Sequence, residues 1–226
     1  MLLYFFADKG IKTAAIYGAF IPNPMHVYRT AGVLAGLGLS YGGATTEEDV
    51  VGLIFADQGI DLSKISGDIK IVSYLQGYGD TTTDEINAAI QAAPEAFISV
   101  GMATTFFTQQ LNAAGIEFSD IDSFTKSNGE AITNGKLVYL AGKYSSSVGP
   151  AFALVMNAIN GNVIRDAQGN AVSLSQNYQV ATDSETFDKF YKNDNGDNPI
   201  YSRDTLDQII GDTVTFDTIN EVVASN

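Results

Sequence analysis

Short apolar runs alternate with helix-like segments along the first two-thirds of the chain, and no other feature constrains the fold as strongly. The runs have the length and apolar content of buried strands, whereas the segments between them repeat apolar residues at helical spacing. Such alternation predicts an α/β fold of three layers, in which a parallel sheet carries helices on both faces. The predicted strands are residues 11–17, 69–75, 96–100, 120–125 and 137–141, and the predicted helices are residues 25–39, 83–93, 104–114 and 147–160.

The other segments have weaker patterns. We expect a short first helix that ends at Lys9-Gly10, because a basic residue followed by glycine is typical of a helix end. Residues 40–67 mix periods between several glycines, so an irregular excursion is expected there. The remaining expectations are a turn at residues 127–129, a strand within 172–181, a polar loop over 192–199 and two short helices within 201–223.

The composition limits the classes of partner and site. The 226 residues include 26 acidic and 12 basic ones, and the net charge of −14 repels phosphate backbones, so we expect no nucleic-acid partner. Cysteine is absent and His26 is the single histidine, which leaves too few ligands for a transition-metal site. His26 is expected to be a surface or capping residue.

Enzyme motifs are missing from the sequence. The glycines of Gly42-Gly43 and Gly77-Tyr-Gly79 lack the spacing of a phosphate-binding loop between a strand and a helix. Ser145-Ser-Ser147 precedes a predicted helix, where capping explains the serines, and no nucleophile motif surrounds them. We therefore expect a protein that is not an enzyme and has no cofactor.

Two stretches resemble the type I periplasmic binding protein and lactose-repressor-like superfamily. The first is Lys12–Gly18 followed by Arg29-Thr-Ala-Gly-Val33, which is similar to the first strand and helix of the C-terminal lobe in that family. The second is Gly129–Leu137, then Val138–Tyr144 and a helix that closes with Asn157-Ala-Ile-Asn-Gly161. The order of elements between the two stretches also matches, so the resemblance covers roughly residues 2–181.

The resemblance implies a domain organisation. Residues 1–144 correspond to the C-terminal lobe of a solute-binding protein, and the N-terminal lobe of such a protein is missing from this sequence. Residues 145–226 correspond to the hinge, a crossover helix and a C-terminal tail that belong partly to the missing lobe. The apolar face of the crossover helix (Phe152, Val155, Met156 and Ile159) then needs a partner, either a neighbouring chain, which would give homo-oligomers through this helix, or a rearranged tail.

The resemblance also implies a function. The family captures a small molecule, sugar-like or another small polar solute, and hands it to the permease of an ABC importer. The full-length protein would be lipid-anchored at the periplasmic or extracellular face of the membrane. The alternative is the effector-sensing domain of a lactose-repressor-like transcription regulator, and a third interpretation is an enzyme of the flavodoxin-like class.

Ligands of this family lie at the carboxyl ends of the strands, and the resemblance places Arg29 at the position of a ligand-binding arginine. Where many members carry carboxylates after two strands, this chain has Gly101-Met-Ala103 and Thr125 or Lys126. These departures favour an anionic or acceptor-rich ligand over a plain hexose. The other residues that follow predicted strand ends and are expected to line the site are Phe20, Gln76, Tyr78, Met102, Thr104, Thr125 and Lys143.

Overall fold

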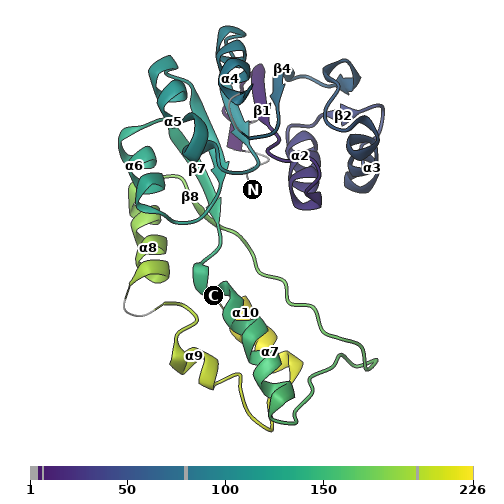
Figure 1. Ribbon diagram of the computed structural model, residues 1–226, viewed down its shortest axis with the longest axis vertical. Helices are drawn as coiled ribbons and strands as arrows, with labels where there is room; N and C mark the ends of the chain where they lie inside the picture. The colour runs from purple at the N-terminus through teal and green to yellow at the C-terminus, as the bar shows by residue number, and fades with distance from the viewer. Residues whose placement is uncertain (1–4, 7, 79–80, 197–198, 226) are drawn as a thin grey trace. The chain divides into compact units, whose positions relative to one another are not determined.

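The computed structural model describes residues 5–6, 8–78, 81–196 and 199–225, and it divides the chain into two compact units (Figure 1). Unit 1 comprises Met1–Asp122, Ser127–Ala141 and Ala181–Ser184. Unit 2 comprises Ser123–Lys126, Gly142–Val180 and Glu185–Asn226. No helix of the described segments is long and apolar enough to cross a membrane.

The main sheet has six strands in the order β4-β1-β5-β6-β7-β8. β1 pairs in parallel with both β4 and β5, and the pairs β5–β6 and β6–β7 are also parallel. The α/β architecture with a mostly parallel sheet, predicted from the alternating pattern, is therefore confirmed. The strands are β1 (Thr13–Tyr17), β4 (Lys70–Leu75), β5 (Ala96–Ser99), β6 (Glu117–Ile121), β7 (Leu137–Gly142) and β8 (Gln179–Ala181).

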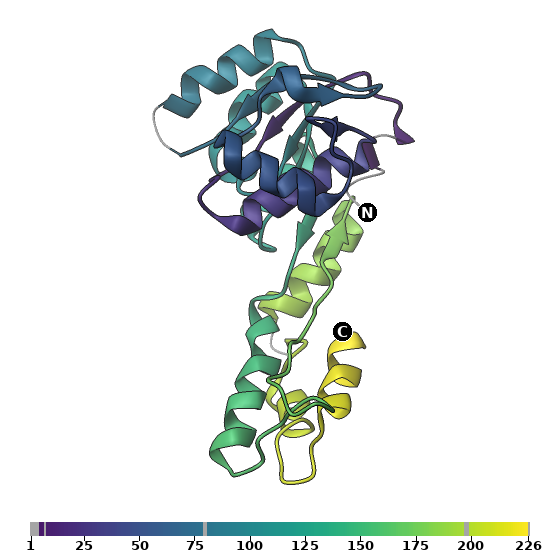
Figure 2. The same cartoon turned by 90° about the vertical axis from the view of Figure 1, so that its right-hand side faces the viewer.

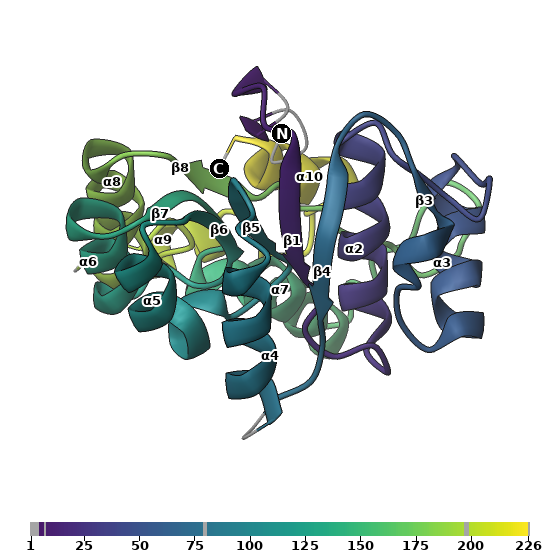
Figure 3. The same cartoon turned by 90° about the horizontal axis from the view of Figure 1, so that it is seen from above.

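Helices cover both faces of this sheet. The chain moves from β1 to β4 in one direction and from β4 to β5 and onward in the other, so right-handed crossovers place the helices between β1 and β4 on one face and the later helices on the opposite face. Accordingly α2 packs against α3 and α4 packs against α5, and in the view from above α4 and α5 lie on the same side of the sheet (Figure 3). The helices are α2 (Pro24–Gly36), α3 (Glu47–Asp57), α4 (Thr81–Gln91), α5 (Ala103–Ala114) and α6 (Lys126–Asn134).

Local chemistry sets the ends of these helices. The Asn23 side chain accepts a hydrogen bond from the backbone N–H of Met25, and Pro24 supplies the fixed φ that suits a first helical position. Helix α5 ends at Gly115, whose φ of +71° is a left-handed conformation that glycine adopts without strain. Strand β1 is apolar and fully buried over residues 14–17, as expected for the central strand of a sheet covered on both faces.

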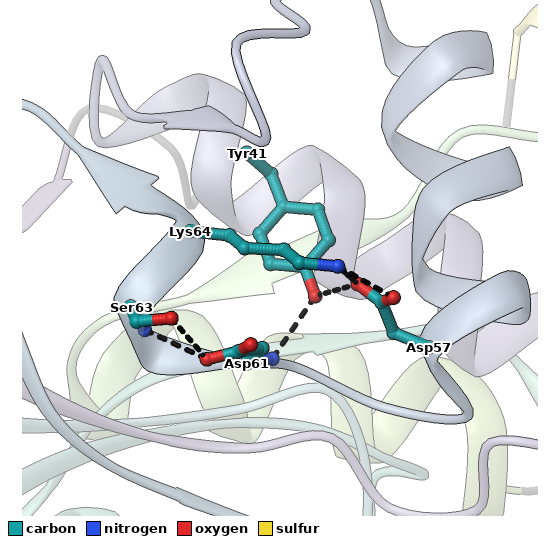
Figure 4. A network of polar contacts seen from close by, with 5 residues as sticks. All are labelled: Tyr41, Asp57, Asp61, Ser63 and Lys64. Atoms are coloured by element: carbon teal, nitrogen blue, oxygen red, sulfur yellow. Dashed lines mark hydrogen bonds and ion pairs between the residues drawn. The ribbon is translucent and has the colours of Figure 1, made fainter.

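The excursion at residues 40–67 is more regular than expected, since it contains α3 and a small antiparallel sheet of β2 (Ser40–Tyr41) and β3 (Ile65–Ser66). A network of polar side chains holds the two ends of this segment together (Figure 4). The hydroxyl of buried Tyr41 donates to Asp57 Oδ2 at 2.5 Å and accepts from the backbone N–H of Asp61 at 3.0 Å. Lys64 Nζ lies 2.6 and 2.7 Å from the two carboxylate oxygens of Asp57. This network ties the end of α3 to the short 3₁₀ turn η1 (Leu62–Lys64).

Four segment predictions are corrected. The strand expected at residues 120–125 is β6, Glu117–Ile121, because the pairing of Phe118 with Phe97 on one side and Leu137 on the other sets its position. The turn expected at residues 127–129 lies inside α6, and the strand expected over 172–181 is limited to β8. The polar loop expected over 192–199 begins later, because α8 (Ser184–Asn195) continues through residue 195.

Unit 2 is built from short helices around a small apolar core. It contains η2 (Ser145–Val148), α7 (Gly149–Ile159), most of α8, α9 (Arg203–Asp207) and α10 (Phe216–Ala224), as Figures 1 and 2 show. The two short helices expected within residues 201–223 are α9 and α10. The core residues are Ala153, Ile164, Ile209, Ile219 and Val223. A second cluster packs the ring of Phe124 against Tyr144, Phe187 and Phe190.

Candidate functional site

The carboxyl edge of the sheet in unit 1 is the candidate binding site. β1 lies between β4 and β5, and the chain leaves β1 and β5 toward helices on opposite faces. In open α/β sheets this reversal of strand order creates the crevice in which ligands bind. The loops at this point follow β1, β4 and β5, and side chains from all three loops meet there.

The loops after β1 and β4 are held against each other. The Tyr17 hydroxyl donates to the carbonyl of Gly77 at 3.0 Å. A Cβ on Gly18 would lie 2.0 Å from the Tyr74 hydroxyl oxygen, so only glycine allows the backbone to pass this closely. The rings of Phe20 and Tyr78 then stack with 5.9 Å between centroids, and Tyr78 also contacts Phe106 at 5.5 Å. We call Phe20, Tyr78 and Phe106 the aromatic platform; Phe20 and Tyr78 are exposed.

Two basic side chains of α2 support the edge beside the platform. Arg29 Nη1 donates to the carbonyl of Val100 at 2.8 Å, which places the half-buried guanidinium over the end of β5. His26 Nδ1 lies 3.0 Å from the backbone nitrogen of Phe20 and accepts its hydrogen. Burial lowers the pKa of His26, and the charge of Arg29 acts in the same direction, whereas the backbone contact with Phe20 opposes both. Of the two roles expected for His26, that of a surface residue is wrong, because neutral His26 is buried and fixes the turn that carries Phe20.

A carboxylate that sequence reasoning missed anchors the loop after β5. Asp120 in β6 is fully buried; its Oδ1 accepts from the Ser99 hydroxyl at 3.0 Å and its Oδ2 accepts from the backbone N–H of Thr104 at 2.8 Å. Met102, at the N-cap of α5, has a φ of 66° and no capping side chain, so Asp120 provides the cap from a neighbouring strand. Burial raises the pKa of Asp120, against the opposing effect of the N–H groups of Thr104 and Ala103.

The corrected position of β6 also changes which residue follows this strand at the carboxyl edge. Since β6 ends at Ile121, the residue that directly follows it is Asp122, not Thr125 or Lys126. The Asp122 backbone N–H donates to the carbonyl of Ala141 at 3.0 Å, which keeps the residue at the sheet edge. One of the two carboxylates expected to be missing after the strands is therefore present, so the expected preference for an anionic ligand is weaker.

A hollow of about 520 Å³ adjoins Phe20, which forms part of its wall. This volume is within the range of small-molecule sites. Apolar side chains dominate its walls, and the amide of Gln76 donates to the carbonyl of Gln58 at 3.3 Å across one end. The lining residues are Phe20, Ile21, Pro22, Phe55, Gln58, Gln76 and Gly77.

The structure separates the predicted site residues into two groups. Five of those in unit 1 lie in loops or at a helix start at the carboxyl edge, and Arg29 lies in the second turn of α2: Phe20, Arg29, Gln76, Tyr78, Met102 and Thr104. Thr125 and Lys143 belong to unit 2, so they are not part of the site described here. Lys143 Nζ lies 5.3 Å from the centre of the Tyr178 ring and lines a different cavity, of about 550 Å³.

In the described part of the chain, no group of three or more histidine, aspartate or glutamate side chains is arranged so that it could hold a metal ion. The sequence matches no protein-family model, and a comparison with curated proteins likewise returned no match.

Proposed function

We propose that this chain is the ligand-binding lobe of a solute-binding protein, which captures a small polar molecule for an ABC importer. It acts by binding and not by catalysis, and its macromolecular partner is the transporter permease. The protein works at the periplasmic or extracellular face of the membrane, lipid-anchored in its full-length form. The resemblance of two sequence stretches and the α/β fold support this proposal.

One observation carries the proposal: the exposed stack of Phe20 and Tyr78 lies at the reversal of strand order, and at the same edge the guanidinium of Arg29 bonds the carbonyl of Val100 after β5. Ligand sites of open α/β sheets occur at this place, and exposed aromatic rings next to fixed polar groups are typical of small-molecule recognition. A role of the two rings in folding alone would not require them to be exposed.

The chemistry of the edge favours a ligand with a flat apolar face and hydroxyl groups. The rings offer a stacking surface, and the adjoining hollow accepts an apolar group of moderate size. Asp122 and Arg29 provide opposite charges, and both are suited to hydroxyl groups. We therefore expect a nucleoside or a sugar with an apolar face to bind better than a simple organic acid.

Ligand-observed NMR on the 226-residue chain tests this proposal, because it detects weak binding. The panel contains neutral sugars, nucleosides, amino acids and organic acids. For the best ligand we expect Phe20→Ala to weaken binding about tenfold, which corresponds to about 1.4 kcal/mol and is within the range of a lost aromatic stack. Arg29→Ala should weaken it to a similar extent, because it removes a polar group and also the brace on Val100.

Matched controls separate binding from folding. Leu62→Ala also removes an exposed apolar side chain of unit 1, and Arg203→Ala removes an exposed arginine of unit 2. Both controls should leave affinity unchanged. The proposal is wrong if no member of the panel binds, or if Phe20→Ala and Arg29→Ala affect binding no more than the two controls.

A further inference from the structure

Helix α7 is apolar on every side, although only one side packs in unit 2. Gly149, Pro150, Ala153 and Asn157 form its buried face. Asn157 fixes this orientation, because its Nδ2 donates to the carbonyl of Ile209 and its Oδ1 accepts from the N–H of Gly211, both at 2.8 Å. A helix that is apolar all round is normally buried all round.

The outer face of α7 carries a continuous apolar stripe. Within α7, Phe152, Val155 and Ile159 are three and four residues apart, the spacing of side chains that line one side of a helix; Val148 directly precedes the helix and Val163 follows its end. At about 100° per residue the stripe lies nearly opposite the buried face. The side chains are between 49% and 71% exposed, and we call them the α7 stripe: Val148, Phe152, Val155, Ile159 and Val163. Met156, expected to belong to this face, is half-buried and lies beside it.

From these observations we propose that the α7 stripe is a self-association surface, on which the α7 stripe of a second copy packs to form a two-fold symmetric dimer. The exposed parts of the five side chains amount to roughly 400–600 Å² per copy, so the contact would bury about 1,000 Å² in total, the lower limit of a specific interface. The dimer is therefore expected to be weak and to depend on protein concentration.

The distribution of charge favours a second copy as the occupant. The chain has a net charge of −14, yet no charged residue occurs between Lys143 and Arg165. Two copies that meet along this segment bring no like charges into direct contact, and the repulsion between the remaining surfaces is long-range and screened by salt. A two-fold contact also needs a patch that is complementary to itself, which a straight apolar stripe provides. The dimer should therefore strengthen when the salt concentration rises.

Sedimentation velocity and light scattering of the 226-residue chain, over a hundredfold range of concentration, test this proposal. Wild type should shift from monomer toward dimer as the concentration rises, and Val155→Asp and Val155→Lys should each remain monomeric, because like charges would then meet across the contact. A mixture of the two variants should recover dimer through an Asp–Lys pair. Leu62→Asp, an equivalent change at an exposed apolar residue of η1, should leave the dimer intact.

Position 155 is exposed, so circular dichroism should show the same helix content and melting temperature for both variants as for monomeric wild type. A wild type that stays monomeric at every concentration would overturn the proposal, including the case in which the stripe is covered within one chain. Dimers that persist equally in Val155→Asp would also overturn it, because the contact would then lie elsewhere. Neither result depends on ligand binding by unit 1.

Discussion

Substitution of Asp120 by alanine would remove one acceptor from three donors: the hydroxyl of Ser99 and the backbone N–H groups of Thr104 and Ile121. Ser99 and Asp120 are fully buried, so water cannot take the place of the carboxylate. A lost helix cap costs about 1 kcal/mol, and a buried donor left without a partner costs about 1–3 kcal/mol. Because such costs are not additive, we expect Asp120→Ala to lower the free energy of unfolding by about 2–4 kcal/mol.

The variant Asp120→Asn separates the cap from the other contacts. Its amide oxygen can still accept from Ser99 and Ile121, whereas its NH₂ group faces the N–H of Thr104, so only the cap is lost. The expected cost near neutral pH is about 1–2 kcal/mol. Burial raises the pKa of Asp120 above the 3.8 of an ordinary aspartate, so the stability that its protonation contributes is complete below 3.8 and is lost as the pH rises through the raised pKa. The difference in free energy of unfolding between wild type and Asp120→Asn should therefore become smaller as the pH rises.

Urea unfolding followed by far-UV circular dichroism, between pH 4 and pH 7, measures both effects. Asp68→Ala is the control, because Asp68 is an exposed aspartate of the same unit and should change the free energy of unfolding by less than about 0.5 kcal/mol. If Asp120→Ala costs no more than this control, the carboxylate does not hold the start of α5. If the difference in free energy of unfolding between wild type and Asp120→Asn grows as the pH rises, the pKa of Asp120 is not raised in the folded state.

Two other changes test the polar contacts of unit 1. Tyr41→Phe removes the hydroxyl that bonds Asp57 and Asp61, and it should lower the free energy of unfolding by about 1–2 kcal/mol in urea titrations, whereas Tyr28→Phe at an exposed position should have no effect. His26 has a lowered pKa, so its contribution to stability is complete above the ordinary histidine value of 6.5 and is lost as the pH falls through the lowered pKa. Thermal melts from pH 7.5 to pH 5 should show this loss in wild type and a smaller one in His26→Gln; equal losses would contradict it.

The order of strands and helices could be predicted because each element carries its own periodicity. The position of β6 could not, because it depends on partners far away in the sequence. Phe124 looked like the end of a strand, yet its ring packs against Tyr144 and two phenylalanines of α8 in unit 2. Ser127-Asn-Gly129 has the composition of a turn, and it became helical because Asn128 and Gly129 are buried in α6. Tertiary packing overrides weak local propensity in such cases.

At the candidate site, too, some features could be predicted from the sequence and others depend on contacts between distant residues. Phe20, Gln76, Tyr78, Met102 and Thr104 could be placed at the carboxyl edge, since the order of strands determines which loops meet there, and the resemblance placed Arg29. Thr125 and Lys143 were placed wrongly, because both belong to unit 2. The roles of Asp120 and His26 could not be predicted, because each depends on a particular hydrogen bond that closes in the folded chain, with Ser99 and with the backbone of Phe20. The sequence pattern predicts Asp120 as the first residue of a strand, whereas in the structure it lies inside β6 between Ser119 and Ile121.

At the carboxyl edge, the polar side chains hold the loops in place and the aromatic side chains are exposed for contact with a ligand. Asp120 caps α5, His26 holds the turn before Phe20, and Arg29 braces Val100, so each of these polar groups bonds the backbone of a loop. Loops fixed in this way lose little conformational entropy when a ligand binds. The faces of Phe20 and Tyr78 stay exposed to solvent at the edge. A ligand would thus be selected mainly by the shape and flatness of its apolar face, and its polar groups would fix its orientation.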